Sequence, residues 1–101
     1  MSAIEPFHLD IPESALIDLK QRLANTRWPE KELVDDWSQG APLSKVQELC
    51  RYWAEDYDRR RCETRLNALG QFKTTIDGLG IHFLHVRSPV ETARPLLMTH
   101  G

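Results

Sequence analysis

The chain has 101 residues, enough for one small domain or for part of a larger one. Its formal net charge of -2 gives no basic footprint for nucleic acid, where a domain pI above about 9 would be expected. No apolar run approaches the roughly 20 residues that a membrane span needs. We therefore expect no nucleic-acid partner and no membrane insertion.

Residues 1–6 lack the basic and apolar regions of a signal peptide. Cys50 and Cys62 are the only two cysteines, and both fall at apolar positions of predicted helices. Free, buried thiols are therefore expected rather than a disulfide. These features together predict a cytoplasmic protein.

A short extended segment over residues 4–11 is predicted first, followed by a helix. Asp10 and Glu13 have the spacing of a capping box at the helix start. Pro29 disfavours helical backbone in the residue before it, so the helix is expected to end near Asn25. Its apolar stripe has spacings of three and four: Ala15, Leu16, Leu19 and Leu23.

Residues 26–42 form a long connection that contains Trp28 and Trp37. A connection of this length is usually functional or packed by its own side chains. We expect both tryptophans to pack into a core. The alternative is that they line a substrate path or a partner surface.

Two further helices are predicted before Gly70. Ser44 and Gln47 have capping-box spacing at the start of the second helix. Asp58 is expected to cap the third helix, and Gly70 to end it. The second helix carries the strongest apolar stripe in the chain: Val46, Leu49, Cys50, Trp53 and Tyr57.

After Gly70 the apolar period changes to two. Residues 71–76 and 81–88 alternate around the turn signal of residues 77–80, which predicts a β-hairpin. Residues 95–101 contain a short apolar run that does not alternate, which indicates a third strand covered on both faces.

Candidate sites other than the chain end carry little chemistry. His82 and His85 are three residues apart on a predicted strand, so they point to opposite faces and no metal site is expected. Arg59–Arg61 and Arg65 lie among as many acidic residues, which predicts a solvated, ion-paired helix face. Neither a G-x-S-x-G elbow nor a G-x-G-x-x-G loop is present.

His100 and Gly101 follow the predicted buried strand directly. A His-Gly pair in this place matches the start of the loop that builds half of an oxyanion hole in α/β-hydrolases. The simpler interpretation is that the two residues only begin a loop.

Several motifs along the chain occur together in one family: Phe7–Pro12, Arg22–Pro29, Trp53–Asp58, Arg65–Asn67, Phe72–Thr74, Ile76–Gly78, Ile81–Ser88 and Leu96–Gly101. With them, the chain resembles the N-terminal region of epoxide hydrolases of the microsomal and juvenile-hormone type. Arg59 departs from the family, which usually has Trp there.

The resemblance implies an α+β chain that is the incomplete N-terminal part of an α/β-hydrolase fold. Residues 1–69 would be the helical meander and residues 70–101 the first strands of the hydrolase core, together one domain over about residues 4–101. His100 and Gly101 would begin the oxyanion loop, whose amide comes from the next residue. The family's motif and packing positions would be Arg27, Trp28, Pro29, Trp37, Trp53 and Tyr57.

In this family an aspartate attacks the epoxide, a histidine oriented by an acid activates water, and two cap tyrosines donate to the epoxide oxygen. None of these maps onto the chain, so no catalytic residue, cofactor or metal is assigned, and whether the chain is an enzyme stays open. The implied role is to brace the hydrolase core and cap of a soluble detoxification enzyme. Its partners would then be that core and cap, with the epoxide as substrate of the full enzyme only.

Two alternatives remain: a free-standing interaction module derived from this domain, and assembly as a homo-oligomer.

Overall fold

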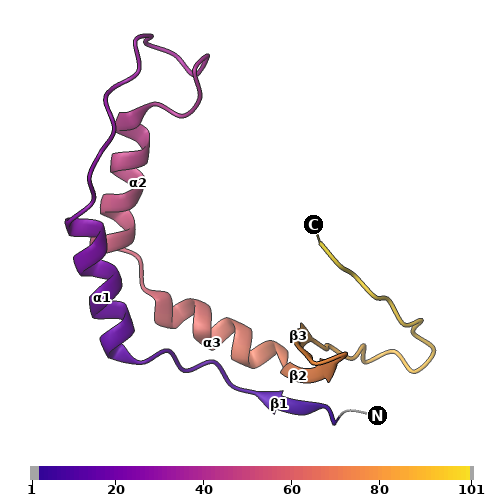
Figure 1. Cartoon of the computed structure of the whole chain (residues 1–101). Coiled ribbons are helices and arrows are strands. Elements are labelled where there is room, and N and C mark those ends of the chain that lie inside the picture. Colours follow the sequence, from indigo (N-terminus) through magenta and orange to yellow (C-terminus); the bar gives the residue numbers. More distant parts are fainter. Residues whose placement is uncertain (1–2, 101) are drawn as a thin grey trace. The chain divides into compact units, whose positions relative to one another are not determined.

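The computed structural model describes residues 3–100, and Met1, Ser2 and Gly101 lie outside the described residues. Within them the chain forms three helices and three strands (Figure 1). The elements in order are β1 (Glu5–Phe7), α1 (Glu13–Ala24), α2 (Leu43–Glu55), α3 (Arg59–Leu69), β2 (Gln71–Ile76) and β3 (Leu79–Leu84). The predicted α+β class is confirmed.

The chain divides into two compact units, which are described separately. One unit is Asp10–Glu63, and the other combines Met1–Leu9 with Thr64–Gly101. The predicted boundary between residues 69 and 70 follows a different criterion, the change from helices to strands, and stays a prediction.

In the unit Asp10–Glu63, α1 and α2 lie against each other (Figure 1). The half-buried residues of each helix recur at spacings of three and four, which is the pattern of one helix face. They are Leu16, Leu19 and Leu23 on α1, and Leu43, Gln47, Cys50 and Ala54 on α2. Cys50 and Cys62 are free and half-buried.

The predicted capping box of α1 is wrong. Pro12 is the N-cap residue and no side chain caps the helix, which begins at Glu13. Asp10 therefore lies two residues before the cap, outside the position from which a side chain can reach the first turn. The predicted end of the helix near Asn25 is confirmed, because Asn25 is the C-cap residue.

The capping box predicted for α2 is also wrong, because a distant carboxylate replaces it. The N-cap is Pro42, which has no side-chain acceptor, so Ser44 falls inside the helix. The first backbone N–H of α2, that of Leu43, donates instead to Glu32 Oε2 at 2.9 Å. This hydrogen bond is the main cause that lowers the pKa of Glu32 from its ordinary value.

Both predicted ends of α3 are confirmed. Asp58 Oδ1 accepts the backbone N–H of Arg60 at 2.9 Å, which is an N-cap bond. Gly70 follows the last helical residue with φ of 86°, in the left-handed region where glycine ends helices.

The hairpin is confirmed, with a tighter turn than predicted. β2 and β3 pair antiparallel, and the turn consists of Asp77 and Gly78 alone. Their φ angles of 51° and 79° fit the two-residue turn that follows the natural twist of paired strands. Leu79 and Gly80, predicted as turn residues, already belong to β3.

The third strand lies elsewhere than predicted. The sheet order is β1-β2-β3, so β1 near the N-terminus supplies the third strand. In the described part, residues 85–100 contain no strand, and Leu97 is 91% exposed. A strand needs a pairing neighbour for its backbone N–H and C=O groups, and no described residue pairs with this segment.

The strand register gives the sheet one mainly apolar face, which includes Thr74, and one mainly polar face, which also holds Phe7 and Leu84. Paired residues lie on the same face, and successive residues lie on opposite faces. The apolar face carries Phe72, Ile76, Leu79, Ile81 and Phe83. Phe72 and Phe83 stack with ring centroids 5.8 Å apart.

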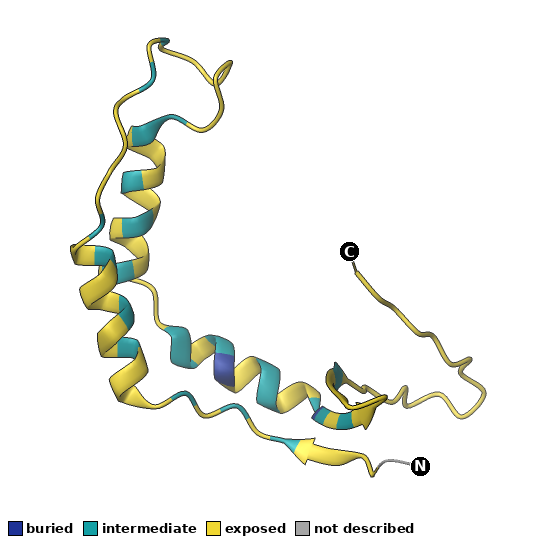
Figure 2. Cartoon of the chain, in the orientation of Figure 1, coloured by how far each residue is buried: buried dark blue, intermediate teal, exposed yellow. Residues whose placement is uncertain are grey.

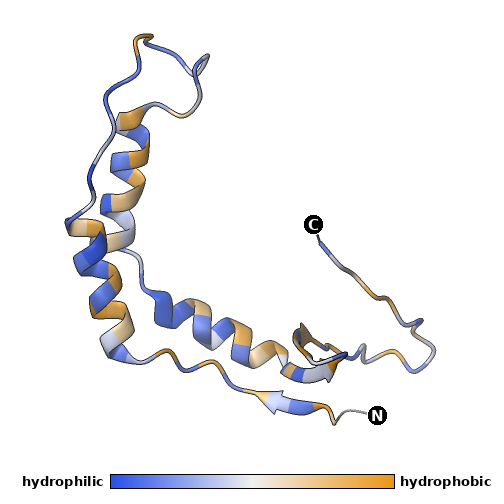
Figure 3. Ribbon diagram, in the orientation of Figure 1, coloured by the Kyte–Doolittle hydropathy of each residue, from blue (hydrophilic) through white to orange (hydrophobic). Residues whose placement is uncertain are grey.

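These apolar side chains are not covered. Among residues 3–100 no hydrophobic side chain is buried, and Figure 2 is mostly yellow for that reason. Hydrophobic segments of α2 and the hairpin, orange in Figure 3, are yellow or teal in Figure 2. The apolar side chains of α2 and of the hairpin thus remain accessible for contacts with other parts of a protein.

Candidate functional site

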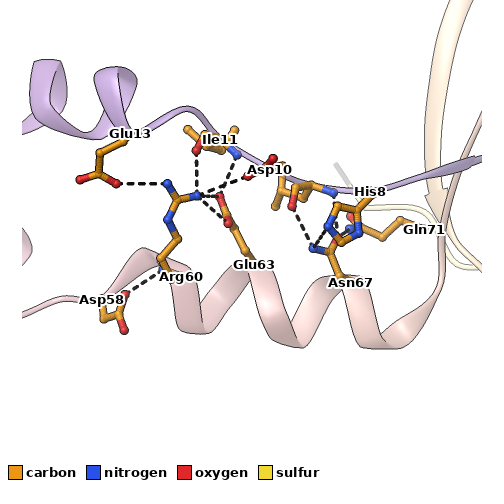
Figure 4. A network of polar contacts seen from close by, with 10 residues as sticks. His8, Asp10, Ile11, Glu13, Asp58, Arg60, Glu63, Asn67 and Gln71 are labelled. Atoms are coloured by element: carbon orange, nitrogen blue, oxygen red, sulfur yellow. Dashed lines mark hydrogen bonds and ion pairs between the residues drawn. The ribbon is translucent and has the colours of Figure 1, made fainter.

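The first polar cluster surrounds Glu63, which is only 7% exposed. Its Oε1 accepts the backbone N–H of Ile11 at 3.0 Å, and its Oε2 accepts Arg60 Nη1 at 2.8 Å (Figure 4). Arg60 Nη1 also donates to Ile11 O at 2.7 Å. Side chains of α3 therefore bond both the backbone N–H and the backbone C=O of Ile11.

Arg60 also gathers the two acids that were predicted to cap α1. Its Nη2 lies 3.2 Å from Glu13 Oε2, and its Nη1 lies 3.9 Å from Asp10 Oδ1. The predicted ion-paired face is thus found for Arg60, although Glu63 is buried rather than solvated. These acids also offset the unfavourable placement of cations in the first turn of a helix.

The ion pair shifts both partners toward their charged forms. The hydrogen bond from Arg60, followed by the one from Ile11 N–H, lowers the pKa of Glu63 from its ordinary value. The hydrogen bonds to Glu63 and Glu13 raise the pKa of Arg60.

The second polar cluster surrounds the Asn67 amide in the other unit (Figure 4). Asn67 Oδ1 accepts Leu9 N–H at 2.8 Å, and Asn67 Nδ2 donates to Leu9 O at 2.9 Å. Gln71 Nε2 donates to Asn67 Oδ1 at 2.8 Å, while Gln71 Oε1 lies 2.9 Å from His82 Nε2. His8 Nε2 lies 3.5 Å from Asn67 Nδ2.

The polar face of the sheet continues this cluster. Gln71 is 4% exposed, and the ring of Phe7 meets the His82 ring edge-on at 5.3 Å. Lys73 Nζ lies 4.4 Å from the centroid of the Phe7 ring, a cation–π distance. Each group in the cluster is thus held by another part of the same chain.

In both clusters, polar side chains bind the chain's own backbone. Among residues 3–100, every buried side-chain nitrogen or oxygen has a hydrogen-bond partner. The described residues contain no group of three His, Cys, Asp or Glu placed to hold a metal ion. His82 contacts Phe7 and His85 contacts Phe72, so the two histidines lie on different faces, as predicted.

The predicted oxyanion-loop residues are not tested by this geometry. His100 is exposed and outside any strand, and Gly101 lies outside the described residues. The assignment of these two residues stays a prediction.

The residues predicted from the family motifs are solvent-exposed: Arg27, Trp28, Pro29, Trp37, Trp53 and Tyr57. Trp37 has the largest exposed fraction of the three tryptophans, 64%. The nearby Cys62 thiol is the main cause that raises the pKa of Tyr57. Their packing role stays a prediction, because no described residue buries them.

The sequence interpretation missed Glu32, Glu63, Asn67 and Gln71 as organising residues. Asn67 was noted only as part of a family motif. No periodicity marks these residues, since a polar residue on a helix usually faces solvent.

No helix of the described residues is long and apolar enough to cross a membrane.

Comparison with known proteins decides the family. Residues 4–101 match the family described as "Epoxide hydrolase N terminus". The chain belongs to this family. The predicted resemblance is thereby confirmed over nearly the whole sequence.

Relatives in the epoxide hydrolase family are much longer than this chain. A Stigmatella aurantiaca protein that carries an epoxide hydrolase name is 58% identical over 98 residues, which are 97% of this chain and 22% of the relative. Epoxide hydrolase 1 of Sus scrofa is 34% identical over 98% of this chain and 23% of its own length. The chain thus spans between a fifth and a quarter of these relatives.

Solved epoxide hydrolase structures contain the same fold. The juvenile hormone epoxide hydrolase of Bombyx mori matches with a TM-score of 0.81 and 29% identity, over 91% of this chain and 24% of that one. The epoxide hydrolase of Aspergillus niger matches with a TM-score of 0.79 and 32% identity, over 90% and 24%. The helices and sheet therefore correspond to the N-terminal portion of epoxide hydrolase structures.

Proposed function

We propose that the chain is the N-terminal part of an epoxide hydrolase, in which it braces the hydrolase core and supports the cap. The observation that carries this proposal is the combination of a family match over residues 4–101 with apolar surfaces that no described residue covers. In this role the chain contributes packing and no reacting group.

Three uncovered surfaces support a bracing role. They are the apolar face of the sheet, the exposed side of α2, and the segment that contains Leu97. The exposed side of α2 carries Val46, Leu49 and Trp53, spaced by three and four residues. Burial of one such side chain is worth roughly 1.5–3 kcal/mol, so covering these surfaces would stabilise the chain and its cover together.

The full enzyme would convert epoxides to vicinal diols through an ester on an aspartate outside this chain. Its hydrolase core and cap would be the partners of this chain, and the epoxide would bind to them. A cytoplasmic location and a role in detoxification complete the proposal.

Two measurements test the proposal. The chain alone, incubated with styrene oxide, should form no diol above the uncatalysed background. A chimera in which residues 4–101 replace the matching segment of the Stigmatella relative should be soluble and should hydrolyse the epoxide if that relative does.

The matched control is the same relative without its N-terminal segment, which should lose solubility or activity. Diol formation by the chain alone would overturn the non-catalytic role. An active truncated relative beside an inactive chimera would overturn the bracing role.

A free-standing interaction module is the second candidate, favoured by the loop before α2. Leu33 N–H donates to Gln39 Oε1 at 3.3 Å, and Ser38 N–H donates to Asp36 Oδ1 at 2.9 Å. The loop thus presents its exposed Leu33 and Trp37 without needing to bury them. A reading frame that continues past codon 101 with the family's core sequence would favour the enzyme part, whereas a stop codon would favour the module.

A further inference from the structure

Residues 3–9, called the strap below, are attached to their unit by a short strand pairing, a few hydrogen bonds and the contacts of the Phe7 ring with His82 and Lys73. β1 pairs with β2 at three positions only, and the middle residue is Pro6, which has no N–H to donate. Thr74 Oγ1 adds a hydrogen bond to Ala3 O at 3.0 Å. No strap side chain is buried, and Phe7 and Leu9 are half-buried.

Beyond the last paired residue, Phe7, a side chain takes over from the strand. The Asn67 amide bonds both the N–H and the C=O of Leu9, as a neighbouring strand would. Because Leu9 N–H can only donate, the Asn67 oxygen must face it, and the amide orientation is fixed. Asn67 therefore supplies, at the end of the strap, the two hydrogen bonds to Leu9 that a neighbouring strand would otherwise make.

The orientation of the Asn67 amide also fixes the orientation of side chains in the hairpin. The Asn67 oxygen also faces Gln71, so the Gln71 nitrogen must donate to it. The Gln71 oxygen then faces His82 Nε2, which must carry the hydrogen. The Asn67 side chain, which comes from α3, is thus connected by hydrogen bonds to Gln71 of β2 and through it to His82 of β3.

We propose that the strap opens as a unit and that the Asn67 side chain is the latch that holds it closed. The hairpin has six paired positions and the stacked Phe72–Phe83 rings, whereas the strap has three paired positions. The strap consequently opens at a lower free energy than the hairpin. Opening leaves the outer edge of β2 with unpaired backbone groups, ready to accept another strand.

The test is amide hydrogen exchange of the full-length protein, followed by mass spectrometry of peptides covering residues 3–11 and 79–84, the second from β3, which does not pair with the strap. Asn67→Ala should speed exchange in the first peptide roughly tenfold to hundredfold, the effect of losing two ordinary hydrogen bonds. Exchange in the second peptide should stay unchanged. Arg65→Ala, an exposed change on the same helix, is the control and should alter neither peptide.

Asn67→Asp keeps the shape of the side chain and serves if the alanine variant does not fold. At neutral pH its second oxygen faces Leu9 O and repels it, so the strap should exchange faster than in the wild type. At acidic pH the protonated carboxyl regains a donor, and the ratio to wild-type exchange should fall. Unchanged strap exchange in a folded variant, or equal acceleration of both peptides, would overturn the proposal.

Discussion

At the scale of single residues, Glu63 is a carboxylate that is nearly removed from solvent yet fully paired. Arg60 and the Ile11 N–H occupy its oxygens. A buried carboxylate loses more stability when one partner is removed than an exposed ion pair would, because the other partner is left unsatisfied.

Glu63→Gln should lower the melting temperature of the Stigmatella chimera, which contains residues 4–101, at pH 7. The pKa of Glu63 is below its ordinary value of 4.5, so the folded state binds this proton more weakly than the unfolded state. Its stabilising contribution is then fully present above about pH 4.5 and is lost as the pH falls through the lowered pKa. The difference in melting temperature between wild type and variant should therefore shrink in acid.

Glu55→Gln is the control for this change, because Glu55 is exposed at the end of α2. It should move the melting temperature little at any pH. A Glu63→Gln variant that melts like the wild type at pH 7 would contradict the proposed importance of the cluster.

Local residue signals could be predicted from the sequence, and long-range ones could not. Asp58 and Gly70 act on residues beside them, so their roles at the ends of α3 were readable. The backbone partners of Glu63 and Asn67, Ile11 and Leu9, lie 52 and 58 positions away, and no spacing rule links them. Side-chain bonds to distant backbone depend on how the chain turns between them.

At the scale of elements, prolines explain the two wrong cap predictions. Pro12 and Pro42 occupy the N-cap positions of α1 and α2. Each has the extended backbone of an N-cap and no side-chain oxygen to complete it. The capping-box spacings that begin at Asp10 and Ser44 therefore predicted N-caps two residues away from the prolines that occupy these positions.

Gly70 joins α3 to β2 and should tolerate no side chain. Its φ is 86°, and a Cβ would lie 3.3 Å from His85 O. In the Stigmatella chimera, Gly70→Ala should lower the free energy of unfolding by about 1–2 kcal/mol from backbone strain alone, measured by denaturant unfolding.

Gly80→Ala is the matched control, since Gly80 lies in β3 of the same unit and its Cβ would meet nothing within 4 Å. It should change stability far less than Gly70→Ala. Equal effects of the two substitutions would show that the helix end is not the constraint.

The strand missed by the sequence interpretation illustrates a limit at the same scale. Residues 4–11 were predicted as extended, and β1 lies within them, but their pairing with β2 was not foreseen. Residues 95–101 were predicted as a strand, yet in the described part Leu97 and its neighbours pair with no other segment. An apolar run indicates a preference for extended backbone, whereas a strand forms only where another segment pairs with it.

At the scale of the whole molecule, the chain has two polar clusters, and its described residues form no buried apolar core. Glu63 and Gln71 are the buried polar residues of the described part, and no hydrophobic residue joins them. Burial of apolar surface is the main favourable term in folding, so the chain by itself has little to oppose the entropy of ordering.

The chain alone should accordingly unfold without a sharp, cooperative thermal transition and should bind a hydrophobic dye before heating. Calorimetry and dye fluorescence measure the two properties. The Stigmatella chimera described above should show a cooperative transition and weaker dye binding. A sharp transition of the chain as a monomer would contradict the view that its apolar surfaces await a cover.

The exposed tryptophans provide an intrinsic fluorescence probe for the covering of the apolar surfaces. All three, Trp28, Trp37 and Trp53, are open to solvent, and they sit in the loop and on α2, where a cover is expected. An indole emits at longer wavelength in water than in an apolar setting. The emission wavelength of these tryptophans would therefore report, without any label, whether the proposed hydrolase core covers the surfaces around them.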